Sequence, residues 1–370
     1  MTLALIVITL LYLFIIGRFV FGFDKVDNFQ FNKGIPKSTF SIVIPFRNEA
    51  ENLPNLLHSL AALNYPSELL EVILIDDDSS DASVKLINEF DNGYRLFENK
   101  RLTASPKKDA ITTAIAQSNH EWIITTDADC VFHQDWLISL DAFIQHKQPK
   151  MIVGPVTYSN NDTFLKRFQL LDFLSLMGAT IGGFGIHKPF LCNGANLTYS
   201  KQVFNDLNGF KGNDAISSGD DIFLMEKILR KYPDDIFYIK HQSAIVLTKA
   251  ESKLSGLIVQ RRRWAAKTSS YHNPFGKLVG AIVLLMNFCL LAGLFLSIFG
   301  IYSISTIGYV FLIKFCVDLW LIFKTIQFMN QTEYLKSYFI SSLLYPFFNV
   351  YIAISSWYSG YTWKGREFKK

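Results

Sequence analysis

The chain has 370 residues, half of them hydrophobic, with 33 Phe and a formal net charge of +4. A chain of this length has room for one domain of about 250 residues and a further region. Its basic residues gather beside apolar runs, which predicts contact with anionic lipid rather than with nucleic acid. The cysteines Cys130, Cys192, Cys289 and Cys316 have no metal-ligand spacing. The composition therefore excludes a CxxC metal site and a disulfide framework.

Long apolar runs lie near both ends of the chain. They are residues 3–16, 278–300, 301–323 and 338–358. The last three are close to the length that crosses a bilayer, so we predict about three membrane segments within 278–358. The first run, which carries no charge and is followed by Arg18, predicts an N-terminal transmembrane anchor within residues 1–20. Pro346 interrupts the last run, which leaves open whether that segment is re-entrant or interfacial.

Basic residues follow the first apolar run, at Arg18 and Lys25, and precede the second, at Arg261–Arg263. Cytoplasmic flanks of membrane segments are enriched in Lys and Arg. The pattern therefore predicts a multi-pass protein of the cell membrane with residues 20–277 in the cytoplasm. Within the third run, Lys314 and Asp318 stand four residues apart, which predicts an internal ion pair on one helix.

We predict one domain over residues 38–248, in which residues 40–156 alternate short apolar runs with helical stretches. We expect strands at 40–44, 71–75, 122–126 and 151–153, and helices at 49–63, 81–90, 106 onward and 134–146. This order is typical of an α/β fold with a parallel, Rossmann-like sheet. Residues 249–275 predict a basic interfacial helix, and Gly182–Gly185 and Cys192–Asn196 predict loops over a pocket. The lack of GxGxxG and GxxxxGK[ST] motifs excludes dinucleotide-cofactor and P-loop enzymes.

Acidic residues follow three of the expected strands. Glu49 comes after the first, Asp76–Asp81 after the second, and Asp127-Ala128-Asp129 after the third. Because ligands bind outside the carboxyl ends of the strands in such sheets, we expect these groups at one edge. Two carboxylates at i and i+2 can face one Mg²⁺ or Mn²⁺ ion that bridges nucleotide phosphates. His133 fits a surface histidine better than a third ligand.

Five motifs together resemble a known family. They are Val43–Glu49, Ile75–Asp81, Asp127–Asp129, Ser218–Leu224 and the QxxRW segment Gln260–Trp264, with Lys107–Ile111 similar to a GK-x-x-AL helix. They resemble family 2 glycosyltransferases of the GT-A fold, in the membrane-anchored branch of cellulose, hyaluronan and chitin synthases and ceramide glucosyltransferase. The resemblance covers Ile42 to Trp264. Departures are Asp78 and Pro106 where Gly is common, Asp220 for Glu, and Asn193 for Gly in the acceptor loop.

The resemblance implies roles for individual residues. Substrate-binding residues are Pro45, Arg47, Glu49, Asp77, Lys108, Asp127, Asp220, Gln260, Arg263 and Trp264. Within this set, Asp77 would bond uracil, Arg263 the diphosphate, and Trp264 the acceptor. Asp127 and Asp129 would hold Mg²⁺ or Mn²⁺. Asp221 would be the general base that takes the proton of the acceptor hydroxyl.

The implied function is inverting, metal-dependent transfer of a sugar from a nucleotide diphosphate, with UDP as the expected nucleotide. About three C-terminal segments favour a lipid or lipid-linked acceptor at the cytoplasmic membrane face. A processive oligosaccharide or polysaccharide synthase similar to chitooligosaccharide synthases stays open as the alternative. A non-catalytic sugar-nucleotide-binding membrane protein is the third interpretation, which the presence of Asp77, Asp127, Asp129 and Asp221 disfavours.

Overall fold

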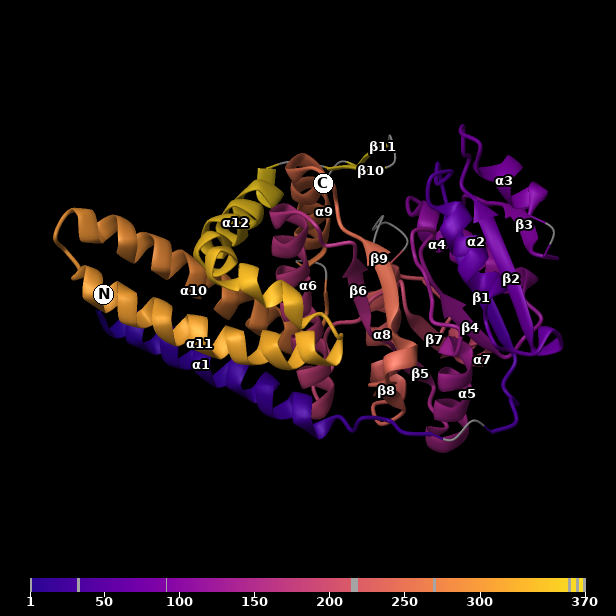
Figure 1. Ribbon diagram of the computed structural model, residues 1–370, viewed down its shortest axis with the longest axis horizontal. Coiled ribbons are helices and arrows are strands. Elements are labelled where there is room, and N and C mark those ends of the chain that lie inside the picture. Colours follow the sequence, from indigo (N-terminus) through magenta and orange to yellow (C-terminus); the bar gives the residue numbers. More distant parts are fainter. Residues whose placement is uncertain are drawn as a thin grey trace. The chain divides into compact units, whose positions relative to one another are not determined.

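The computed structural model describes residues 2–31, 34–90, 92–213, 219–268, 271–358, 361–363 and 366–368. It divides into two compact units (Figure 1). The first, the helical unit, comprises Met1–Val26, Asn160–Leu191 and Ala250–Lys370, and the second, the sheet unit, comprises Asp27–Ser159 and Cys192–Lys249. Residues 160–191, which the sequence analysis placed inside the domain of residues 38–248, thus lie in the helical unit.

The sheet unit alternates strands and helices along the chain. Its elements are β1 (Phe40–Phe46), α2 (Leu53–Ala61), β2 (Leu70–Asp76), α3 (Ser83–Glu89), β3 (Arg95–Glu98), α4 (Pro106–Gln117), β4 (Trp122–Thr125), α5 (Trp136–Lys147), β5 (Met151–Val153), β6 (Val156–Ser159), β7 (Leu197–Ser200), α7 (Lys201–Asp206), α8 (Asp220–Lys231), β8 (Ile236–Tyr238) and β9 (Val246–Lys249). The predicted strands at 40–44, 71–75, 122–126 and 151–153 are confirmed within one or two residues.

The main sheet has seven strands in the order β3-β2-β1-β4-β7-β5-β8 (Figure 1). Strands β3, β2, β1 and β4 are parallel, as the alternating pattern predicted. The four predicted strands β1, β2, β4 and β5 all run in the same direction, and the strand that was not predicted is β7, which lies antiparallel between β4 and β5. The four consecutive parallel strands place the turns after β1, β2 and β4 at one edge, where the acidic motifs stand.

The apolar composition of the strands explains their burial. Ile42, Val43 and Ile44 of β1 are fully buried, and so are Ile73, Leu74 and Ile75 of β2. A strand covered on both faces reads as a continuous apolar run rather than an alternating one. Helix α4 begins as predicted, with Ser105 at the N-cap position and Pro106 as its first residue.

The helical unit is built from long apolar helices. Its elements are α1 (Thr2–Lys25), α6 (Phe164–Gly185), α9 (Leu254–Thr268), α10 (Pro274–Ile298), α11 (Ile304–Phe328), the 3-10 helix η3 (Thr332–Ser337), α12 (Tyr338–Tyr358), β10 (Tyr361–Trp363) and β11 (Arg366–Phe368). Among the described residues, five helices are long and apolar enough to cross a membrane: α1, α6, α10, α11 and the η3–α12 segment. The predicted one-plus-three arrangement therefore gains α6 as a further candidate.

Helix α6 corrects one prediction. Gly182–Gly185, expected as a loop, forms the end of this helix. A Cβ atom added to Gly182 would lie 2.4 Å from the Phe19 carbonyl oxygen, and one added to Gly185 would lie 1.8 Å from that of Gly22. The glycines therefore serve close packing of α6 against α1, as small residues do between membrane helices.

Two further predictions concern α11 and α12. The ion pair of Lys314 and Asp318 is confirmed, with Nζ and Oδ2 2.5 Å apart, and Tyr12 of α1 donates its hydroxyl hydrogen to Asp318 Oδ1 over 2.7 Å. Helix α12 runs through Pro346 without an end there. Neighbouring helices and local adjustment of the backbone tolerate a proline at such a position.

Candidate active site

The turns after β1 and β2 are joined by side-chain hydrogen bonds. The backbone N–H groups of Asn48, Glu49 and Ala50 donate to Ser79 Oγ, Ser83 Oγ and Asp81 Oδ2 over 3.0, 2.9 and 3.0 Å. In return, Asn48 Oδ1 accepts from the backbone N–H of Ser80 over 2.8 Å. These bonds fix the segment that contains Arg47 and Glu49 against the segment that contains Asp77 and Asp78.

Two arginines pair with the aspartates after β2. Asp77 is buried, and its Oδ1 accepts from Asn99 Nδ2 and Arg101 Nε, each over 2.7 Å. Arg47 Nη1 donates to the Asp77 carbonyl oxygen over 2.6 Å and to Asp78 Oδ2 over 2.9 Å. The Arg47 guanidinium lowers the pKa of the Asp78 carboxyl, and Arg101 lowers it further. Arg101 was not predicted as a site residue, because it lies in none of the motifs.

The Asp127–Asp129 turn after β4 meets a lysine and a threonine. Lys107 Nζ lies 2.7 Å from Asp127 Oδ1 and 3.4 Å from Asp220 Oδ2. Burial opposes the charge of Lys107, but Asp127 and Asp220 raise its pKa above the usual range. Asp129 Oδ2 accepts from Thr248 Oγ1 over 3.0 Å, and burial followed by the charges of Asp127 and Glu49 raises the pKa of Asp129 to about 6.

Asp220 and Asp221 begin α8, after Gly219 at φ +80°. Asp221 Oδ2 accepts from the backbone N–H of Gly194 over 3.1 Å, and its Oδ1 accepts from that of Ile222 over 2.8 Å. A Cβ atom on Gly194 would lie 3.1 Å from Asp220 Oδ2, so a side chain there would crowd the carboxylates. The predicted loop at Cys192–Asn196 thus packs against the start of α8. Ser218 of the same motif lies outside the described residues.

The two neighbouring lysines of α4 have different surroundings. Lys108 is 2% exposed, and its Nζ donates to the Asn213 carbonyl oxygen over 2.7 Å and lies 5.1 Å from the centre of the Phe223 ring. The ammonium group of Lys107 instead lies beside the carboxylates of Asp127 and Asp220. Successive residues of a helix point about 100° apart, so one of the two turns inward. The GK-x-x-AL motif marks Lys107 and could have identified it.

The site offers some of the oxygen ligands that a divalent cation requires. Among the residues that the structure describes, no three His, Cys, Asp or Glu side chains are grouped to hold a metal ion. His133 is exposed and accepts from the backbone N–H of Asp135 over 3.1 Å, in agreement with a surface role. Mg²⁺ is commonly bound by one or two carboxylates together with substrate phosphates and water. Asp127 and Asp129 fit such a site.

The QxxRW residues lie in the helical unit, on α9. Gln260, Arg263 and Trp264 are all partly buried. Arg261, which the prediction did not single out, is the most buried arginine of this segment and is paired with Asp172 of α6, with Nε and Oδ2 2.7 Å apart. The carboxylates of the sheet unit and the QxxRW residues therefore belong to different units.

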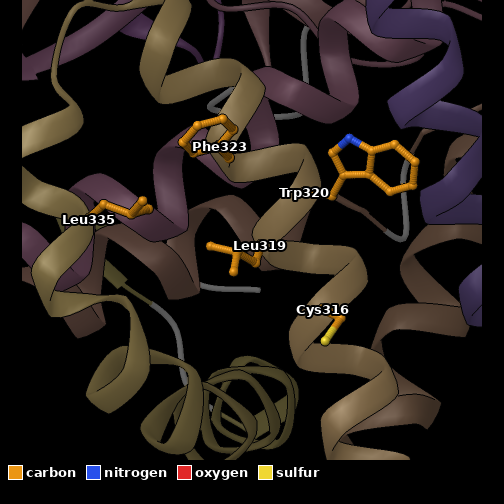
Figure 2. Close-up of a pocket in the computed structure, with 5 residues that line it drawn as sticks. All are labelled: Cys316, Leu319, Trp320, Phe323 and Leu335. Atoms are coloured by element: carbon orange, nitrogen blue, oxygen red, sulfur yellow. The ribbon is translucent and has the colours of Figure 1, made fainter.

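A pocket of about 460 Å³ opens in the helical unit, between α11 and η3. Figure 2 shows the side chains around it: Cys316, Leu319, Trp320, Phe323 and Leu335. The lining carries no carboxylate or basic group and therefore offers nothing for acid–base chemistry. Its apolar character suits a hydrocarbon chain.

Comparisons with known proteins agree with the motifs. A family model described as "Glycosyl transferase family 2" matches residues 41–207. The chain is 27% identical over 186 residues to "Glycosyltransferase AglE" of Haloferax volcanii, which covers 49% of this chain and 58% of that protein. It is 25% identical over 227 residues to "Poly-beta-1,6-N-acetyl-D-glucosamine synthase" of Staphylococcus epidermidis, which covers 61% of this chain and 53% of that one. The match thus spans somewhat more than half of each relative's length.

One solved structure has a similar fold over most of its length. It is the mannosyltransferase PcManGT of Pyrobaculum calidifontis, described in complex with GDP-Man and Mn²⁺. The TM-score is 0.55 at 17% sequence identity, and the match covers 92% of this chain and 96% of that one. At this identity the likeness shows the fold, which confirms the predicted GT-A fold. The five long apolar helices are consistent with the predicted membrane anchoring.

Proposed function

We propose that this chain, in which residues 41–207 form a glycosyl transferase family 2 domain, transfers a sugar from a nucleotide diphosphate to an acceptor hydroxyl with inversion at the anomeric carbon. The observation that carries the proposal is the cluster of carboxylates at the sheet edge. Asp127 and Asp220 meet at Lys107, and Asp221 lies beside them at the start of α8. Such a cluster offers acidic groups for two tasks, the binding of a cation and the removal of a proton.

Asp221 is the proposed general base. Its carboxylate would take the proton of the acceptor hydroxyl while the acceptor oxygen bonds to the anomeric carbon and the bond to the nucleotide diphosphate breaks. The Gly194 N–H, 3.1 Å from Asp221 Oδ2, would hold this carboxylate in place. Asp127 and Asp129 would hold Mg²⁺ or Mn²⁺, which when bound neutralises charge on the leaving diphosphate.

Donor binding is assigned to the turns after β1 and β2. Pro45, Arg47, Glu49 and Asp77 would form the nucleotide side of the site, with Asp77 toward the base. Lys107 takes the role that the prediction gave to Lys108, because its ammonium group reaches Asp127. Arg263 would bind the diphosphate and Trp264 the acceptor, with Gln260 beside them on α9.

The acceptor we favour is a lipid or lipid-linked sugar at the cytoplasmic face of a multi-pass membrane protein. The five apolar helices, which would hold the catalytic domain at the bilayer, support an acceptor that is itself in the membrane. A processive synthase is the second candidate, since the staphylococcal relative carries the name of a poly-beta-1,6-N-acetyl-D-glucosamine synthase.

Isolated membranes that contain the chain test both candidates. They are incubated with a panel of radiolabelled UDP- and GDP-sugars and Mn²⁺. A labelled product that extracts into organic solvent supports the lipid acceptor, and a ladder of water-soluble oligomers supports the synthase. Asp221→Asn should lower transfer by about 10³-fold, as expected when a general base is lost. The exposed Asp206 at the end of α7 gives the control Asp206→Asn, which should keep full activity. Equal transfer by both variants would contradict the role of Asp221.

A further inference from the structure

We propose that Asp172 of α6 and Arg261 of α9 form a positioning pair that fixes the indole of Trp264 and the amide of Gln260 for acceptor binding. The proposal rests on the proposed function, in which Trp264 binds the acceptor and Gln260 lies beside it on α9. All of the contacts that carry it lie within the helical unit.

Helix α6 holds α9 through polar groups on one face. Gln169, fully buried, donates from Nε2 to the Glu251 carbonyl oxygen over 2.9 Å and accepts from the Glu251 N–H over 3.0 Å. Three residues later, Asp172 Oδ2 accepts from Arg261 Nε over 2.7 Å. Residues three apart share a face of a helix. The two contacts therefore hold the chain leading into α9 and the middle of α9 from the same side.

Both partners of the ion pair are buried, and this burial helps to decide whether the pair stabilises the protein or orients other side chains. The side chains of Arg261 and Asp172 are 6% and 8% exposed. Replacing a buried ion pair by apolar residues of similar volume often leaves a protein as stable or more stable, so burial of a pair is weak evidence for a stabilising role. A role in orientation is the better explanation when the pair also contacts functional side chains.

Arg261 contacts two members of the QxxRW motif. Its Cζ lies 4.2 Å from the centre of the Trp264 ring, and its Nη1 donates to Gln260 Oε1. Phe173, next to Asp172 on α6, lies 6.1 Å from Trp264 between ring centres. A guanidinium can pair with a carboxylate and stack on an indole at once, because it is planar and has several donors. A lysine at this position would keep the charge and lose the stacking.

Two variants distinguish a role of the pair in orienting Trp264 from a role in the stability of the protein. Arg261→Lys keeps the charge beside Asp172 but removes the planar group over Trp264. The double variant Asp172→Leu, Arg261→Met removes both charges and keeps apolar volume. We expect both proteins to melt close to the wild-type temperature in detergent. The KM for the acceptor should rise about tenfold, the size expected for a lost orienting contact of this kind, with the KM for the donor within about twofold.

A control is an ion pair near the start of α6 in the same unit. Lys166→Met with Asp162→Asn removes this pair, in which Nζ and Oδ1 lie 2.7 Å apart. This variant should leave the acceptor KM unchanged. Acceptor binding is measured with polyprenyl phosphate or an N-acetylglucosamine tetramer, according to which one the wild type glycosylates. A structural role alone would move melting temperature and kcat and would leave acceptor KM as it is.

A second readout does not depend on activity. The fluorescence contributed by Trp264 is obtained by subtracting the spectrum of Trp264→Phe from that of the wild type, and likewise in the Arg261→Lys background. A shift of this difference spectrum supports the pair. Unchanged acceptor KM and unchanged Trp264 emission in Arg261→Lys overturn it. If the wild type transfers no sugar from any donor, the proposed function fails, and the emission comparison alone decides about the pair.

Discussion

The turns after β2 and β4 both present aspartates at the carboxyl edge of the sheet, but Asp77 and Asp78 are neutralised to a different extent from Asp127 and Asp129. Asp77 and Asp78 are met by Arg101 and Arg47, both within hydrogen-bond distance. Asp127 shares Lys107 with Asp220, and the partner of Asp129 at 3.0 Å is the neutral hydroxyl of Thr248. Arg47 and then Arg101 lower the pKa of the exposed Asp78, whereas burial, followed by the charges of Asp127 and Glu49, raises the pKa of Asp129.

The carboxylates after β2 are already paired before a ligand binds, whereas those after β4 lack enough positive charge without one. A carboxylate that is paired with guanidinium groups costs little to keep ionised and stays in place. Carboxylates close together without enough positive charge repel one another and gain most when a cation arrives. This difference supports the proposal that the turn after β2 holds the nucleotide base and that the turn after β4 takes up a divalent ion with the donor.

Removal of one carboxylate from each turn should give the largest effect. Asp129→Asn should lower sugar transfer by about 10²- to 10³-fold, because a cation that stabilises the leaving diphosphate would lose a ligand. Asp78→Asn, at the exposed end of the other turn, should lower it by at most about threefold. Transfer rates are measured across a Mn²⁺ titration and after EDTA treatment. Similar losses in both variants would remove the distinction between the turns.

The two lysines of α4 allow the charge balance at the turn after β4 to be tested by thermal unfolding. Lys107→Met leaves Asp127 and Asp220 without their shared ammonium group, so Mn²⁺ should stabilise this variant more than it stabilises the wild type. We expect the gain in Tm on adding Mn²⁺ to grow by about 3 °C, which corresponds to roughly 1 kcal/mol in a protein of this size.

Lys108→Met is the matched control. It should lower the Tm without Mn²⁺, since it removes the bond to the Asn213 carbonyl oxygen, and leave the gain on adding Mn²⁺ unchanged. Equal gains in the two variants and the wild type would show that Lys107 does not compensate the carboxylates.

We expect the two turns to respond to pH in different pH ranges. The pKa of Asp129 is raised to about 6, so protons compete with Mn²⁺ for this carboxylate below that pH. Without the cation, acidification has the opposite effect and favours the folded protein. A raised pKa means that the folded state binds the proton more tightly, so the contribution of Asp129 to stability is present at low pH and is lost as the pH rises through about 6.

Titration calorimetry with Mn²⁺ at several pH values from 7.5 to 5.5 measures this competition. The affinity should weaken on acidification in the wild type, and this weakening should be reduced in Asp129→Asn. The lowered pKa of Asp78 keeps its pairing with Arg47 across the same range. A pH-independent affinity in the wild type would show that Asp129 is not a ligand.

Local patterns were enough to predict the parallel half of the sheet. The apolar runs of β1, β2 and β4 identify strands, and the acids at their ends identify the edge. The antiparallel β7 was missed because Leu197–Ser200 is a short run with nothing in its sequence to fix its place between β4 and β5. Strand order depends on long-range pairing, which local residue patterns do not record.

The partners of the site residues were less predictable than the residues themselves. Arg101 reaches Asp77 from the loop after β3, and Thr248 reaches Asp129 from β9, 119 positions away in the chain. Helix α6 is a similar case. Its Gly182 and Gly185 suggest a loop by composition, and the close approach of α1 makes them part of a helix. Each of these outcomes depends on a neighbour that is remote in the sequence.

The smallest effect is expected at Asp78, where the chain departs from the glycine common in the family. Asp78 has φ +67°, in the left-handed region that glycine adopts without strain. Asp78→Gly should relieve this strain while it loses two exposed ion pairs of small value, whereas Asp78→Ala loses the same pairs and keeps the strain. The glycine variant should therefore be more stable than the alanine variant by about 1 kcal/mol in chemical unfolding. Equal stability would mean that Arg47 and Arg101, and not the backbone, determine how this turn is held.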